Sequence, residues 1–297
     1  MHIGPTEIVD TFAEAFALRY ARLVVTALDR HWLDAAAASF CGYGTSVIGC
    51  DAEAGLEGHL DPKDTPDGRP GAALLAFAFG PEGLGRALAN RTGQCLLTCP
   101  TTAVFDGLPA ARERLPLGGH VRFFGDGFEK ANVVGGRRFW RVPVMDGEML
   151  VEETAGTLEG VGGGNFIVQG ETQDATCAAA RRAVAAIAAV PGAITPFPGG
   201  AVRSGSKVGS RSGSLRASTN EAFCPALVGR VDSQLVAGAS CALEIVIDGV
   251  DAPAVSAAMA AGIRAAAGPG IPAISAGNYA GTLGRHRFHL HEVLAAS

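Results

Sequence analysis

The chain has 297 residues and a formal net charge of −5, with 18% charged and 48% hydrophobic residues. This composition argues against a general nucleic-acid-binding surface, and the length allows two domains of ordinary size. Seven cysteines form no Cys-x-x-Cys pattern, so we expect reduced thiols and no metal site built from them. The N-terminus does not resemble a signal peptide and no run is long and apolar enough to span a bilayer, which predicts a cytoplasmic protein without membrane contact.

Two strand–helix–strand units are predicted in the first half of the chain. A β-branched run at 21–27, a helical stretch through Trp32 and a short run at 45–49 form the first unit. The second unit consists of a strand at 72–78, a helix that begins near Pro81, and a strand at 94–99.

The second half repeats this order with Ala-rich helices. A strand at 165–171, a helix at 173–190 and a strand at 193–197 are followed by a strand at 241–247. Asp251 stands where a helix cap belongs, and the helix that follows ends at Gly268-Pro269. The strands predicted last are Ile271–Ser275 and the alternating run His286–Val293.

Two such units in series predict an α+β fold made of two ferredoxin-like βαββαβ lobes that arose by duplication. We place the N-terminal lobe at residues 1–147 and the C-terminal lobe at residues 148–297. A fold of this kind hosts many functions, so it does not identify the chemistry.

The stretch 195–225 is rich in Gly, Ser, Pro, Arg and Lys and shows no apolar period. Connections of this length are usually functional or disordered, and scattered apolar residues such as Phe197 and Phe223 favour an ordered binding surface. Glycines allow close backbone approach, while hydroxyls and cations suit an anionic ligand. Ordinary surface charge is the simpler interpretation, but it does not explain the density of glycines.

Glu244 is the most conspicuous ionisable residue, because it lies within the apolar strand CALEIVI. Leu243, Ile245 and Ile247 share one face of that strand, and Glu244 lies on the other. If its face is covered, burial raises the pKa of the carboxyl toward neutrality and suits it to general acid–base catalysis. If its face is open to water, Glu244 is an ordinary charge, and the sequence leaves both alternatives open.

Two further motifs are weaker. His289 and His291 have the spacing of two zinc ligands on a strand, but no third ligand is recognisable, so we predict no metal site. The glycines of GVGGGNF (160–166) precede a strand rather than open a helix, which excludes a dinucleotide loop and favours a tight turn or a close backbone approach.

Taken together, a series of strings along nearly the whole chain resembles one family, formylmethanofuran:tetrahydromethanopterin formyltransferase. The strings are DTFAEAF (10–16), GYGTSVIGCDAEAG (42–55), TPDGRPG (65–71), FFGDGFE (123–129), GGNF (163–166), PFPGG (196–200), SKVGS (206–210), STN (218–220), EIVIDG (244–249), SAGNY (275–279) and HLHE (289–292).

The resemblance implies a transferase that moves a formyl group between methanofuran and tetrahydromethanopterin, which act as substrates, without a tightly bound cofactor. It also implies two ferredoxin-like lobes, a homodimer or homotetramer, and Glu244 as the catalytic carboxylate. The mildly acidic, Ala- and Arg-rich composition resembles bacterial members, in which formylmethanofuran hydrolase subunits are partners. A ligand-sensing or scaffold protein with paired ferredoxin-like domains is the alternative.

Several residues are candidates for the substrate site. The oxyanion of a tetrahedral intermediate requires hydrogen-bond donors, and anionic parts of the substrates require cations. The sequence does not distinguish among the donors, and Arg203 and Lys207 are the cations that we expect. The full set of expected substrate-binding residues is Phe197, Gly199, Gly200, Arg203, Ser206, Lys207, Gly209, Asn220 and Asn278.

Overall fold

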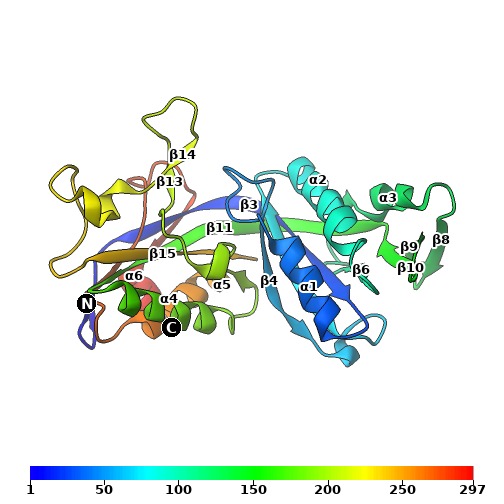
Figure 1. Cartoon of the computed structure of the whole chain (residues 1–297), viewed down its shortest axis with the longest axis horizontal. Helices are drawn as coiled ribbons and strands as arrows, with labels where there is room; N and C mark the ends of the chain where they lie inside the picture. The colour runs from blue at the N-terminus through cyan, green and yellow to red at the C-terminus, as the bar shows by residue number, and fades with distance from the viewer. Residues whose placement is uncertain (297) are drawn as a thin grey trace. The chain divides into compact units, whose positions relative to one another are not determined.

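The computed structural model describes residues 1–296, which divide into two compact units (Figure 1). One unit contains residues 18–159, and the other combines residues 1–17 with residues 160–296. Helices and strands are interspersed in both units, and both parallel and antiparallel strand pairs occur, so the α+β class is confirmed. Among residues 1–296, no helix is long and apolar enough to cross a membrane.

The unit of residues 18–159 has the strand order β4-β5-β3-β6-β10-β9-β8. Its strands are β3 (Phe12–Thr26), β4 (Glu53–Leu60), β5 (Gly71–Ala78), β6 (Ala103–Asp106), β7 (Glu113–Pro116), β8 (Lys130–Val134), β9 (Arg137–Val144), β10 (Gly147–Glu152) and the start of β11 (Thr154–Gly170). Its helices are α1 (Arg30–Cys41), α2 (Pro81–Arg91), α3 (Gly118–Val121), the short 3-10 turns at Pro62–Asp64 and Arg122–Gly125, and a π-helical turn at Thr92–Leu96.

The unit that contains Glu244 has the strand order β1-β2-β16-β11-β15-β12, and β17 pairs with the start of β3. Its further strands are β1 (His2–Ile3), β2 (Thr6–Ile8), β12 (Ala193–Ile194), β13 (Lys207–Val208), β14 (Ala217–Ser218), β15 (Cys241–Gly249), β16 (Ala273–Ser275) and β17 (His286–His289). Its helices are α4 (Gln173–Ile187), α5 (Ala252–Ala266), α6 (Leu290–Ala295) and 3-10 turns at Pro198–Gly200, Glu221–Phe223 and Pro225–Leu227.

Two strands predicted in the first half are wrong. Residues 45–49 form a turn, in which the N–H groups of Gly49 and Cys50 donate to Ser46 O, and the strand begins later, at Glu53. The run 94–99 continues α2 as a π-helical turn that Leu97 N–H closes by donating to Thr92 O at 2.8 Å. Short apolar runs suit a buried helical turn as well as a strand, so hydrophobicity alone did not separate the two.

The predicted helices are confirmed, and their caps explain where they begin. Thr172 caps α4 by accepting from Ala175 N–H at 3.2 Å, and Asp251 caps α5 by accepting from Ala254 N–H at 2.8 Å. The last predicted strand is too long, because β17 ends at His289 and α6 begins at Leu290. His289 and His291 therefore do not share a strand face.

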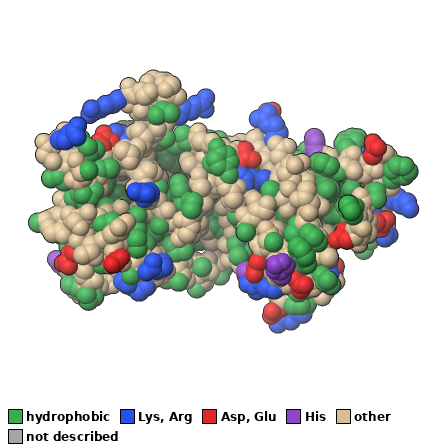
Figure 2. Space-filling view, in the orientation of Figure 1, with side chains coloured by type: hydrophobic (Ala, Val, Ile, Leu, Met, Phe, Trp, Pro, Cys, Tyr) green, Lys and Arg blue, Asp and Glu red, His purple; other side chains and the backbone are tan. Residues whose placement is uncertain are grey.

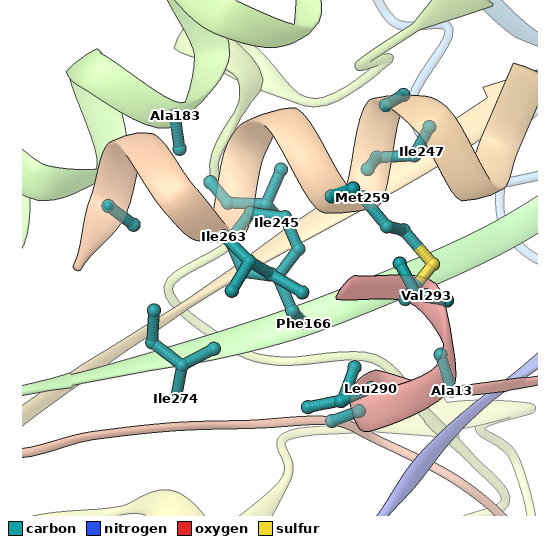
Figure 3. Packing of buried hydrophobic residues seen from close by; sticks show 14 of the residues in the cluster. Ala13, Phe166, Ala183, Ile245, Ile247, Met259, Ile263, Ile274, Leu290 and Val293 are labelled. Carbon is teal, nitrogen blue, oxygen red and sulfur yellow. The ribbon is translucent and has the colours of Figure 1, made fainter. Parts of the chain in front are cut away.

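One face of β15 and β11 packs against α4 and α5, as Figure 1 and the close view in Figure 3 show. Phe166 of β11 and Ile245 and Ile247 of β15 are fully buried on this face, where they meet Met259 and Ile263 of α5. Apolar burial of this kind stabilises the unit and holds β15 straight against β11. The alternate residues of both strands therefore point away from the helices.

The glycines of GVGGGNF lie inside β11, where they form a register shift between Val161 and Gly164 rather than a turn. Gly163 has a positive φ of 86°, a backbone conformation that suits glycine. A Cβ at Gly164 would clash with the side chain of Val255 in α5. The alternative of close backbone approach is the one that the structure supports.

Candidate active site

Glu244 lies on the face of β15 that points away from α4 and α5. It pairs with Ile167 of β11, which in turn pairs with Ser275 of β16. Asn165 and Gln169 flank Ile167 on the same face of β11, so buried polar side chains gather here. Only 2% of the Glu244 surface is exposed, so its face of the strand is covered rather than open to water. The sequence alone leaves both alternatives open.

Residues 202–240, which we call the covering segment, lie over this face. In Figure 1 the part that carries β13 and β14 stands on the side of β15 opposite α4. Val202 pairs with Glu244 through two backbone hydrogen bonds of 2.8 and 3.0 Å, and farther along the segment Val236 N–H donates to Gln169 Oε1 at 2.9 Å. These bonds hold the covering segment against this face of the sheet near both of its ends.

The Glu244 carboxyl has few partners for its degree of burial. Oε2 accepts a hydrogen bond from the backbone N–H of Ser206, whereas the buried Oε1 has no hydrogen-bond partner among the described residues. Burial raises the pKa of Glu244 to about 7, and the backbone and hydroxyl of Ser206 oppose this only in part. The protonated and ionised forms therefore coexist near neutral pH.

This arrangement indicates which oxygen carries the proton. Because Oε2 must accept from Ser206 N–H, the proton of the neutral carboxyl resides on Oε1. Gly277 lies beside Oε1, and a Cβ on this glycine would be 3.6 Å from that oxygen. Asn165 holds Gly277 in place, since its Oδ1 accepts from Gly277 N–H at 2.6 Å and its Nδ2 donates to Gly277 O at 3.1 Å.

Residues 277–284 form a loop, the Tyr279 loop, that borders the carboxyl. The Tyr279 hydroxyl is 3.5 Å from Ser206 O, and the backbone of Val208 also hydrogen-bonds this phenol. Burial raises the pKa of Tyr279, and the neighbouring charge of Glu244 raises it further. Tyr279 therefore stays a neutral phenol at physiological pH.

Three of the predicted substrate-binding residues are brought together with Glu244. Ser206 contacts its carboxyl, and Arg203 and Asn220 line a narrow pocket that ends at Glu244. Gly205, which has a positive φ of 68°, packs against the Cβ side of Asn220 in this pocket. Arg203, Asn220 and Glu244 thus line one small space.

Other predicted residues serve different contacts. Gly200 N–H donates to Phe197 O at 2.7 Å and Gly209 N–H donates to Arg216 O at 2.8 Å. Asn278 donates to Phe12 O at 3.1 Å and accepts from Ala280 N–H, which commits its amide to the loop. The pocket that ends at Glu244 is not lined by Phe197, Gly199, Gly200, Gly209 or Asn278.

Lys207 lies in a second pocket, the cationic pocket, which is formed within the covering segment. Its ammonium group makes an ion pair with Glu221, so much of its charge is neutralised. The same pocket contains two arginines and three hydroxyl groups: Arg211, Arg230, Ser210, Ser218 and Thr219. Figure 2 shows Lys and Arg side chains on both sides of the β13–β14 hairpin.

Sequence reasoning missed Asn165, Gly277 and Tyr279 as parts of this site. GGNF and SAGNY had been singled out as strings, but their contact depends on the pairing of β11 with β16. Pairing between distant segments is not encoded in any local pattern. Within residues 1–296, no three His, Cys, Asp or Glu side chains gather in a group that could hold a metal ion.

Two protein-family models match this chain. Residues 1–144 match the model of formylmethanofuran-tetrahydromethanopterin formyltransferase, and residues 147–293 match the model of the proximal lobe of the same family. The chain belongs to the formylmethanofuran–tetrahydromethanopterin formyltransferase family. The two matches together span nearly the full sequence, so membership rests on both halves.

Relatives of the same name are similar over their full length. The formyltransferase of Methylococcus capsulatus is 50% identical over 99% of this chain and 100% of its own, and that of Methanococcoides burtonii is 48% identical over the same shares. The solved formyltransferase of Methanosarcina barkeri is 46% identical with a TM-score of 0.93, covering 99% of this chain and 100% of its own. A chain of the Methylorubrum extorquens formyltransferase/hydrolase complex with methylofuran is 47% identical with a TM-score of 0.95, covering 99% of this chain and 98% of its own.

The environment of Oε1 makes Gly277 a sharp test of the site. We expect Gly277→Ala to lower formyl-transfer turnover by about 10- to 100-fold, because a methyl group would cover the oxygen that carries the proton. Gly277 does not have a positive φ, so any fall in melting temperature should come only from the close contact of the new Cβ with Asn165 Oδ1, at 3.3 Å. Gly213→Ala, in open space, is the matched control for steady-state kinetics. Full turnover of Gly277→Ala would show that Oε1 does not face the reaction.

Proposed function

We propose that this chain transfers a formyl group between formylmethanofuran and tetrahydromethanopterin, both bound at once, with Glu244 moving the proton. Membership of the family names the reaction, and one observation carries the mechanism: Glu244, a buried carboxyl whose pKa is about 7, belongs to the lining of a small pocket. The two coenzymes act as substrates, and no tightly bound cofactor takes part.

The chemistry requires a proton donor. A ring nitrogen of the pterin attacks the formyl carbon and a new C–N bond forms, giving a tetrahedral intermediate with an oxyanion. The C–N bond to methanofuran then breaks, and the departing nitrogen must take up a proton because an amide anion is a very poor leaving group. Glu244 Oε1 donates that proton, and the carboxylate afterwards regains the proton that the attacking nitrogen loses.

Asn220 is the best-placed group for the oxyanion. The N–H groups of Gly200 and Gly209 are occupied by backbone acceptors, and the Asn278 amide is committed to its own loop. Asn220 lines the same pocket as Glu244, and its side-chain amide can donate to a developing negative charge. Arg203 at this pocket adds positive charge.

We infer that the cationic pocket binds the anionic part of a substrate. Arg211 and Arg230 make no salt bridge within residues 1–296, whereas Lys207 is already paired with Glu221. The two arginines are therefore more available than the lysine, although the charge of Arg211 also acts on Glu221. Guanidinium groups bind carboxylates and phosphates in a bidentate manner. Ser210 adds a hydroxyl donor, whereas the hydroxyls of Ser218 and Thr219 already donate to Gly209 O and Ser204 O.

The fold and assembly are part of the proposal. We infer two ferredoxin-like lobes, residues 1–147 and 148–297, and the order β11, α4, β12, β15, α5, β16 in the second half supports this. We also infer a homodimer or homotetramer and hydrolase partner subunits, like the complex of the Methylorubrum extorquens relative. Exposed apolar side chains within residues 123–145 support association: Phe123, Phe124, Phe128, Val133, Val134 and Met145.

The central prediction concerns Glu244→Gln, which keeps the shape of the side chain and removes its proton. Turnover should fall by about 10²–10⁴-fold with little change in KM. In the parent, kcat/KM should fall as pH rises through about 7, because the protonated carboxyl is the active form, and this limb should vanish in the variant.

The melting temperature of Glu244→Gln shows whether a loss of turnover comes from the missing proton or from damage to the fold. A raised pKa means that the folded state favours the protonated form, so the stabilising contribution is lost as pH rises toward 7. Glu244→Gln removes the buried charge, and its melting temperature at pH 8 should be no lower than that of the parent. Glu171→Gln, at an exposed position, is the control. More than about a third of parental turnover with an unchanged pH profile would remove Glu244 from the mechanism.

The second prediction concerns the cationic pocket. Removing either arginine, by Arg211→Ala or Arg230→Ala, should raise the KM of one substrate by about 5- to 100-fold, as loss of a charge-assisted contact of about 1–3 kcal/mol implies. Lys207→Ala should have a smaller effect because Glu221 already neutralises the lysine. Arg216→Ala, an exposed arginine of the same hairpin, is the control. Equal KM values for all four variants would leave the pocket without a role.

The third prediction concerns association. Light scattering of the purified chain at micromolar concentration should give the mass of a dimer or tetramer, because the apolar side chains within residues 123–145 are too many for a free surface. A fully active, monodisperse monomer would contradict it.

A further inference from the structure

Glu14 is a second buried carboxyl in the same unit, and its surroundings differ from those of Glu244. It lies in β3 with 1% of its surface exposed and faces the Tyr279 loop. Oε2 accepts from the N–H groups of Tyr279 and Gly281, both at 2.8 Å, and Oε1 accepts from those of Leu283 and Gly284, both at 2.5 Å. One side chain thus organises the backbone of the whole loop.

The loop needs this support because its conformation is unfavourable in itself. Ala280 has a positive φ of 56° and Gly281 a positive φ of 72°, and a non-glycine residue in this region is strained. A carboxylate that accepts four backbone N–H groups compensates for that strain. Burial acts to raise the pKa of Glu14, but these four donors outweigh burial and lower it. Glu14 is therefore ionised throughout the neutral range.

A short chain of contacts leads from Glu14 to the reacting carboxyl. Glu14 fixes the backbone of Tyr279, whose hydroxyl meets Ser206 O and the backbone of Val208. Directly beside the first of these contacts, the N–H of the same Ser206 donates to Glu244 Oε2. Tyr279 thus holds the stretch of the covering segment that hydrogen-bonds Glu244 and keeps water from it.

We propose that Glu14 is a positioning residue for formyl transfer, holding the Tyr279 loop so that Tyr279 braces Ser206 and the covering segment over Glu244. This inference rests on the proposed function. Without the four hydrogen bonds the loop relaxes, the brace at Ser206 loosens and water reaches the Glu244 carboxyl. The pKa of Glu244 then falls toward its ordinary value, and less of the proton donor is present at neutral pH.

Other ionisable groups lie near the contacts that link Glu14 to Glu244. Arg203 and Cys224 line the pocket of Glu244 from the covering segment, and Arg287 lies opposite Glu14 on β17, where it donates to Gly281 O at 2.6 Å. Within residues 1–296, none of these three side chains hydrogen-bonds the Glu14 carboxylate, whose partners are the four N–H groups of the Tyr279 loop. A shift in the titration of Glu244 after such a change therefore reports the position of the loop.

The test compares the parent with two variants. Glu14→Gln presents an NH₂ group to backbone N–H groups that require an acceptor. Tyr279→Phe removes only the hydroxyl group of Tyr279. The titration midpoint of Glu244 is measured by carboxyl ¹³C NMR, assigned with Glu244→Gln, alongside kcat and KM. Both variants should lower the midpoint by about one pH unit or more and lower kcat by about tenfold or more, with KM changed less than about threefold. The double variant should be little worse than Glu14→Gln alone, because both changes act through one contact.

Asp106→Asn is the matched structural control, since Asp106 is a buried carboxyl that accepts backbone N–H groups of Leu108 and Gly156 in the other unit. It should lower the melting temperature without moving the Glu244 midpoint. The inference is wrong if Glu14→Gln lowers only the melting temperature. It is also wrong if Tyr279→Phe, which should fold in any case, leaves the titration midpoint of Glu244 unchanged. The NMR readout does not depend on turnover, so a parent without formyl-transfer activity would contradict the proposed function separately.

Discussion

The site depends on the burial of one carboxyl, Glu244, with too few hydrogen-bond donors to keep it ionised. Glu14 shows by contrast what donors do: burial acts to raise the pKa of this carboxyl, but four backbone N–H groups lower it. At Glu244, Ser206 is the one residue within 1–296 that hydrogen-bonds the carboxyl, and burial raises its pKa. Backbone donors and depth of burial together therefore distinguish a structural carboxylate from a proton donor in the same unit.

The two faces of β15 have different roles, since one stabilises the fold and the other carries the reactive carboxyl. On one face Ile245 and Ile247 pack against α5 and hold the strand in register with β11. On the other face, under the covering segment, the strand carries a carboxyl that is costly to bury. The apolar face stabilises the strand enough to offset that cost, which explains why a charged residue stands in the middle of an otherwise apolar run.

Periodicity predicted the helices of this chain well, because α2, α4 and α5 combine long amphipathic patterns with Pro, Thr or Asp at their starts. It failed at 45–49 and 94–99, where short apolar runs fold into turns whose partners are local carbonyl groups. Glu244 was recognisable because a carboxylate in an apolar strand breaks the pattern. Gly277 and Tyr279 were not, since they reach Glu244 only through strand pairing across more than a hundred residues.

Infrared difference spectroscopy of the parent against Glu244→Gln tests the central claim most directly, because a protonated buried carboxyl has its own carbonyl stretching band. The account predicts a band at pH 6 that is absent from the variant and that disappears on raising the pH, with a midpoint of about 7. Absence of that band at pH 6, or a midpoint near the ordinary value of about 4.3 for a glutamate, would contradict it.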